Sequence, residues 1–137
     1  MLVVDSGPLV AAALSRDRNH TRCVELLMSA ERPLIVPTLV VTEVAYFLGE
    51  RLGQHAERSF VGALRDGELE VEPIAPGDWD RIYELLDEYD GLGLGVVDAS
   101  ILALMERLDL AVLATLDHRH FGVLRPAHRD ALILLPN

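Results

Sequence analysis

Four acidic residues stand in apolar surroundings where a lone charge is unfavourable. Asp5 ends the apolar run that opens the chain, and Asp117 follows another apolar run in ATLD. Glu43 and Asp98 are the only charges in VPTLVVTEVAYFLG and GLGLGVVDASILAL. Because clustered carboxylates repel one another, a hard divalent cation such as Mg²⁺ or Mn²⁺ would stabilise them together. One or two such ions can activate water for phosphodiester hydrolysis.

Each acid also has a structural interpretation. Asp98 and Asp117 taken singly are typical of helix N-termini or loops. Asp5 and Glu43 are harder to explain in this way, because burying an unpaired charge is costly. No Arg, Lys or His lies within eight residues of Asp5 or Asp98 to pair with them. The sequence also has no cysteine pair and no HExxH pattern, so a zinc site is less favoured than a Mg²⁺ or Mn²⁺ site.

The elements that must position these acids alternate along the chain. Short apolar runs predict strands, and segments with helical periodicity predict helices between them. The strands are expected at Leu2–Val4, Leu34–Val36, Leu69–Ile74, Ala111–Leu116 and Leu132–Leu135. The helices are expected at Asn19–Ala30, Thr38–Leu52, His55–Leu64, Pro76–Tyr89 and Val96–Leu108. This alternation predicts an α/β fold, a parallel sheet of about five strands sandwiched by helices, in a single domain over residues 1–137.

The expected sheet brings the acids to one edge. Sites in open parallel sheets form at the carboxyl ends of the strands. Asp5 and Asp117 each follow a strand there. Glu43 falls in the second turn of a helix that starts after the second strand, and Asp98 falls in the first turn of another helix. We therefore expect all four carboxylates to converge.

Composition narrows the classes of function. The formal net charge is −10, and all 12 basic residues counted as Lys or Arg are arginines. The absence of lysine excludes a P-loop lysine and Schiff-base chemistry. The acidity argues against nucleic-acid binding through a basic surface, although metal ions could still hold a nucleic-acid substrate. No apolar run approaches the roughly 18 residues needed to cross a bilayer, and no secretory signal is evident, so we expect a cytoplasmic protein without membrane contact.

Four segments together resemble a known family. MLVVDSG, VTEVAYFLG, GVVDAS and TLDHRHF are similar, in this order, to the motifs of PIN-domain ribonucleases, and above all to VapC-type toxins of bacterial toxin–antitoxin pairs. The resemblance extends from Leu2 to about Pro126 and implies a PIN domain that cleaves RNA with Mg²⁺ or Mn²⁺. It also implies a homodimer and a cognate VapB-type antitoxin as partner.

The resemblance carries over to individual positions. The four acids of the family's site match Asp5, Glu43, Asp98 and Asp117, which would bind the metal and support catalysis. Ser6 matches a small hydroxyl residue after the first acid, and Thr115 matches a hydroxyl two residues before the last one. Arg119, in LDHRHF, is a candidate for phosphate contact.

Other interpretations remain open. A catalytically weak PIN-like module that binds RNA or protein would keep the fold without the activity. A receiver-like module would need a lysine that this chain lacks, and a phosphoaspartyl hydrolase would need DxD where this chain has DSG. We expect His118 and His120 on opposite sides of an extended segment, without a catalytic role. Tyr46 and Phe47 are interpreted as core or dimer contacts rather than base-stacking surfaces.

Overall fold

The computed structural model describes residues 1–137 and contains one five-stranded sheet. All neighbouring strands pair in parallel, in the order β3-β2-β1-β4-β5. The strands are β1 (Leu2–Val4), β2 (Leu34–Pro37), β3 (Glu70–Glu72), β4 (Val112–Ala114) and β5 (Ile133–Leu135). Each expected apolar run overlaps one of these strands, so the predicted α/β fold is confirmed.

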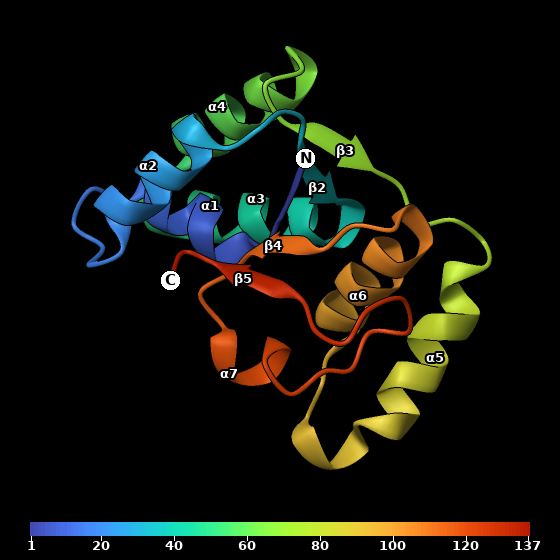
Figure 1. Cartoon of the computed structure of the whole chain (residues 1–137). Coiled ribbons are helices and arrows are strands. Elements are labelled where there is room, and N and C mark those ends of the chain that lie inside the picture. Colours follow the sequence, from blue (N-terminus) through green and yellow to red (C-terminus); the bar gives the residue numbers. More distant parts are fainter.

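Helices connect the strands and form two groups around the sheet (Figure 1). Helix α1 packs against α2 and α3, α3 also packs against α4, and α5 packs against α6 elsewhere on the sheet. The helices are α1 (Ser6–Ala13), α2 (His20–Ser29), α3 (Thr38–Leu52), α4 (Gln54–Arg65), α5 (Asp78–Glu88), α6 (Val96–Leu108) and α7 (His118–Phe121), with a 3₁₀ turn at Asp90–Leu92. None of these helices is both long enough and apolar enough to cross a membrane.

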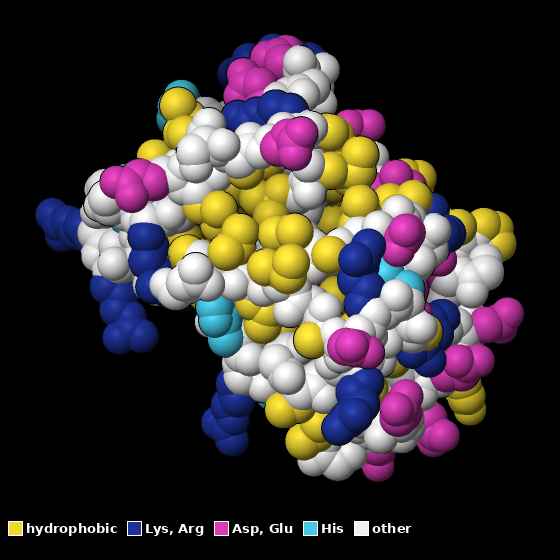
Figure 2. Space-filling model, in the orientation of Figure 1, with side chains coloured by type: hydrophobic (Ala, Val, Ile, Leu, Met, Phe, Trp, Pro, Cys, Tyr) yellow, Lys and Arg dark blue, Asp and Glu magenta, His cyan; other side chains and the backbone are white.

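The hydrophobic core lies at the three central strands. Strands β1 and β2 are buried throughout, as expected for strands that are covered on both faces. Helix α6 contributes an unbroken buried segment, 99–105. The edge strands are more exposed, with Val71 of β3 at 40% and Ile133 of β5 at 55%. In Figure 2 hydrophobic side chains gather in the middle of the face that carries β4 and β5, and charged side chains surround them.

Two helices are absent from the sequence prediction. Helix α1 has the sequence SGPLVAAA, which is almost uniformly small or apolar and therefore shows no amphipathic period. Helix α7, with the sequence HRHF, is a single turn and is too short to show a period at all. The segment that we expected to be extended after Asp117 is therefore helical.

Candidate functional site

The site lies at the carboxyl end of the two central neighbouring strands. Val3 pairs with Leu113 and Val4 with Ala114, so the residue after β1 faces the residue after β4. These residues are Asp5 and Thr115. The Thr115 hydroxyl, which is fully buried, donates a hydrogen bond of 2.8 Å to Asp5 Oδ2. The parallel register thus fixes the first carboxylate of the site from two distant parts of the chain.

Asp5 also begins helix α1. Its Oδ1 accepts a 2.7 Å hydrogen bond from the backbone N–H of Ser6, so both carboxylate oxygens have a donor. The side chain is nonetheless nearly inaccessible, with the residue 7% exposed. Burial raises the pKa of Asp5, the hydrogen bonds from Thr115 and Ser6 oppose that rise, and the nearby charges of Glu43 and Asp117 add to it. Asp5 is therefore held in a fixed orientation but is electrostatically unfavourable as an anion.

Glu43 reaches the same pocket from the second turn of α3. The Ser6 hydroxyl donates a hydrogen bond to Glu43 Oε1. Ser6 therefore links the two acids, because its backbone N–H binds Asp5 and its side chain binds Glu43. A hydroxyl at this position serves an orienting role that glycine or alanine could not.

Asp98 differs from the other three acids because its carboxylate takes part in no hydrogen bond or ion pair within the chain. It projects from the first turn of α6, where the helix dipole favours a negative charge. Burial raises its pKa to about 6, and the charges of Asp5, Asp117 and Glu43 contribute in the same direction, whereas His120 opposes them. Asp98 is thus the carboxylate with the most free coordination capacity.

Asp117 is held by the one-turn helix α7. The backbone N–H of His120 donates to Asp117 Oδ1 at 3.1 Å, and the ring Nδ1 of His120 lies 2.7 Å from Asp117 Oδ2. Burial favours the neutral acid, but the hydrogen bonds and charge of His120 outweigh it and hold the pKa of Asp117 below its ordinary value. The Asp117 backbone N–H donates in turn to the Thr115 hydroxyl at 3.1 Å.

The position of His120 corrects the sequence interpretation. Because 118–121 is helical, His120 returns to Asp117 instead of pointing away from it, and donor atoms of Asp98, Asp117 and His120 lie within 4.8 Å of one another. His118 has a different contact, from its Nε2 to the Thr115 carbonyl at 3.0 Å. The signal that could have identified His120 is the D-x-x-H spacing, in which an N-cap aspartate meets the third residue of the following helix.

The four acids line one pocket of about 390 Å³. Its lining residues are Asp5, Ser6, Gly7, Glu43, Asp98, Leu116 and Asp117. No arginine forms an ion pair with any of the four carboxylates; the only ion-pair partner is His120, which contacts Asp117. Arg119 is exposed and does not line the pocket, although its charge helps to lower the pKa of Asp117.

The chemistry of this donor set suits a hard divalent cation. Carboxylate oxygens dominate the pocket, and oxygen is the donor that Mg²⁺ prefers, while Mn²⁺ accepts oxygen and imidazole. A cation would also relieve the repulsion that raises the pKa of Asp98. The residues present therefore fit such an ion.

Comparison with known proteins identifies the family. The profile of the PIN domain matches residues 2–124. The chain belongs to the PIN domain family. This PIN domain is 26% identical over 135 residues to Ribonuclease VapC26 of Mycobacterium tuberculosis, and the match spans 98% of this chain and all of the relative.

Solved structures share the fold of this PIN domain. The sarcin–ricin loop cleaving toxin VapC20 of M. tuberculosis superimposes with a TM-score of 0.77 at 20% identity, over 82% of this chain and 87% of that one. A toxin–antitoxin complex from Klebsiella pneumoniae gives 0.73 at 20% identity, over 97% of this chain and 100% of that one. VapBC2 of Rickettsia felis, bound to a promoter DNA fragment, gives a TM-score of 0.68 at 18% identity, over 97% of this chain and 96% of that one.

Proposed function

We propose that this PIN domain is a Mg²⁺- or Mn²⁺-dependent endoribonuclease that acts as the toxin of a toxin–antitoxin pair. The observation that carries the proposal is a pocket with four carboxylates and no paired arginine. The carboxylates in such a pocket repel one another until a bound cation neutralises them. A relative that covers nearly the whole chain is named a ribonuclease, which supports RNA as the substrate.

Asp5, Glu43, Asp98 and Asp117 would hold the metal. When bound, the ion supplies Lewis-acid stabilisation of a phosphodiester oxygen and lowers the pKa of a water molecule that can attack phosphorus. It also neutralises the pocket toward a polyanion, which the net charge of −10 would otherwise repel. The remaining features of the reaction come from how the chain orients these carboxylates.

The chain prepares the carboxylates in different ways. Asp5 is fixed by Thr115 and by the Ser6 backbone, and its near-complete burial limits its motion. Asp117 is fixed through both oxygens by His120. Asp98 keeps both oxygens free of protein donors, so it can ligate without breaking a hydrogen bond. Fixed and free ligands together favour a geometry that needs little reorganisation when substrate binds.

Cleavage of RNA by the purified protein tests this proposal. Wild-type protein should cut single-stranded RNA when Mg²⁺ or Mn²⁺ is present, and should stop when EDTA is added. Asp5→Asn and Asp98→Asn should each abolish cutting, whereas Asp87→Asn, at an exposed position of α5 outside the pocket, should leave it unchanged. Cutting that persists in both pocket variants would remove the proposed role of the pocket. RNA binding without cutting in the wild type would favour a catalytically weak PIN-like binding module.

The proposed partners follow from the structural neighbours. Several of them are complexes of toxin with antitoxin. We infer that this chain forms a homodimer and binds a VapB-type antitoxin encoded beside it. Co-expression with the adjacent small reading frame should yield a stable complex whose ribonuclease activity is suppressed, and light scattering of the chain alone should give the mass of a dimer. A monomer that does not bind the neighbouring gene product would contradict this inference.

A further inference from the structure

An aromatic and cationic groove adjoins the acidic pocket. It encloses about 180 Å³, and its lining residues are Ser6, Gly7, Val10, Ala11, Asp17, Phe47, Arg51 and Leu116. Three of them, Ser6, Gly7 and Leu116, also line the pocket that holds the four acids. The groove is therefore continuous with the proposed active site rather than a separate surface feature.

Helix α3 connects the two regions through one face. Glu43, Phe47 and Arg51 follow one another at intervals of four residues, so their side chains lie on the same side of the helix. At 1.5 Å per residue, Phe47 is about 6 Å and Arg51 about 12 Å farther along the axis than Glu43. The three side chains therefore lead from the acidic pocket along α3 into the groove.

The groove side chains are available for a ligand. Phe47 is 37% exposed and Tyr46 is 62% exposed, so neither is a core residue, contrary to one of the two sequence interpretations. Their rings contact edge to face, with centroids 5.9 Å apart. The Arg51 guanidinium lies 5.7 Å from the Phe47 ring centroid and takes part in no hydrogen bond or ion pair within the chain. All of its N–H donors remain free.

The chemistry of the groove matches a nucleotide. Bases stack on aromatic rings with little sequence preference, and a guanidinium provides planar donors for phosphate or base edges. The unpaired Arg51 guanidinium is important for binding an anionic ligand here, because Asp17 also lines the groove and the whole chain is strongly acidic. We propose that Phe47 and Arg51 form a subsite for the RNA nucleotide next to the scissile phosphate, with its base on Phe47 and its backbone phosphate on Arg51. The subsite rests on the ribonuclease function proposed above.

Binding of defined oligonucleotides separates stacking from charge. The probes are fluorescein-labelled single-stranded 12-mers of adenylate and of abasic ribose phosphate, with fluorescence anisotropy in Mg²⁺ as the readout and Asp98→Asn as the background that prevents cleavage. The background protein should bind the adenylate probe about 5- to 100-fold more tightly than the abasic one. Phe47→Leu, which keeps an apolar side chain, should remove most of that preference. Arg51→Met should weaken both probes and reduce the slope of log affinity against log salt by about 0.7.

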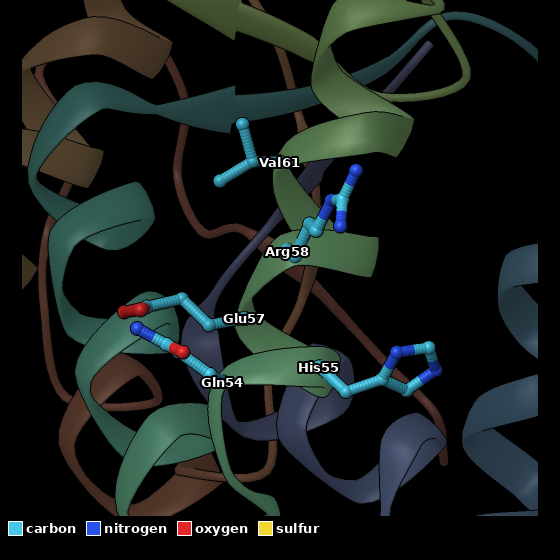
Figure 3. Close-up of a pocket in the computed structure, with 5 residues that line it drawn as sticks. All are labelled: Gln54, His55, Glu57, Arg58 and Val61. Atoms are coloured by element: carbon cyan, nitrogen blue, oxygen red, sulfur yellow. The ribbon is translucent and has the colours of Figure 1, made fainter.

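Two control variants remove a guanidinium or an aromatic ring outside the groove. Arg58 of α4 lines a separate hollow of about 520 Å³ with Gln54, His55, Glu57 and Val61, which contains none of the four acids (Figure 3). Arg58→Met therefore removes one charge without touching the groove, and Tyr83→Leu removes an aromatic ring that is 77% exposed on α5. Neither control should change the preference for adenylate, and Arg58→Met should change the salt slope less than Arg51→Met.

The outcomes distinguish the subsite from the activity itself. A preference that survives Phe47→Leu, or an Arg51→Met variant indistinguishable from Arg58→Met, overturns the subsite even when metal-dependent cleavage is intact. Unchanged RNA binding together with weakened antitoxin binding in both groove variants would also overturn it, in favour of a protein-docking groove. Conversely, a Phe47-dependent preference in a protein that never cuts RNA supports base binding in the groove but refutes the ribonuclease proposal, and with it the position of the subsite beside a scissile phosphate. Failure to bind either probe refutes the subsite.

Discussion

Replacement of Asp98 by asparagine should stabilise the metal-free protein at neutral pH. Removing a carboxylate from a folded protein usually removes favourable contacts, but Asp98 has no hydrogen-bond or ion-pair partner within the chain. Burial and three neighbouring acids raise its pKa to about 6, from an ordinary value of 3.8. The anion is thus less favourable in the folded state than in the unfolded chain, and the variant removes that unfavourable anion.

The magnitude follows from the pKa difference. A rise from about 4 to about 6 corresponds to ~3 kcal/mol of lost stability once the group is ionised in both states. Since Asp98 is only partly buried, solvent screening reduces this to ~1–2 kcal/mol. The favourable interaction of the anion with the N-terminus of α6, ~0.3–1 kcal/mol, is also lost in the variant. A net gain of ~1 kcal/mol at pH 7.5 remains.

The pH dependence of stability tests the direction of the Asp98→Asn effect independently of its size. Between about pH 4 and pH 6 the folded protein binds a proton at Asp98 that the unfolded chain releases, so wild-type stability falls as pH rises through this window. The variant lacks this contribution. Urea denaturation in EDTA at pH 4 and pH 7.5 should show similar stability at the lower pH and the more stable variant at the higher one. A variant that is less stable at pH 7.5, or a difference that does not depend on pH, would refute the reasoning.

Three further predictions concern the metal-binding carboxylates and the residues that hydrogen-bond to them. Thr115→Val should lower the free energy of unfolding at pH 7 by about 1–3 kcal/mol, because Asp5 and the Asp117 N–H both lose the buried Thr115 hydroxyl as a partner. Urea denaturation in EDTA measures this free energy, and an unchanged denaturation midpoint would contradict the prediction. His120→Ala should weaken Mn²⁺ binding by about 10–100-fold in calorimetry, and His120→Asn, whose amide can replace Nδ1, should recover most of the affinity; equal loss in both would remove the orienting role. Mn²⁺ at about 100 times its dissociation constant should stabilise the wild type by about 2.7 kcal/mol, and an absence of thermal stabilisation would count against binding to the folded state.

Much of the fold could be predicted from the sequence because four of the five strands, all except β3, are short apolar runs. Leu2–Val4 and Leu34–Pro37 are buried on both faces, so their apolar runs are continuous and end sharply at polar or proline-containing segments. Helix α1 is not predicted because its almost uniformly small or apolar sequence has no amphipathic period. Its helical state is set by Asp5 as N-cap and by packing on α2 and α3. These helix–helix contacts cannot be read from the local sequence.

The convergence of the acids could be predicted for the same topological reason. Parallel strands have their carboxyl ends at one edge of the sheet, so the sequence alone predicts that Asp5 and Asp117 lie close together. The roles of His120 and of the Phe47–Arg51 groove were not foreseen. The first depends on a single helical turn at 118–121, and the second depends on how α1 and α3 pack, because residues of both helices line the groove. Arg119 stays a predicted phosphate contact, from an exposed position beside Asp117.

The most direct test of the account is the location of a divalent cation in the protein. Anomalous diffraction from crystals soaked in Mn²⁺ reports that position independently of RNA target, antitoxin or cleavage sequence. We predict a peak within coordination distance of the carboxylates of Asp5 and Asp98. Mn²⁺ bound only elsewhere on this acidic surface, or no peak at saturating Mn²⁺, would contradict a metal-dependent site built from these four acids.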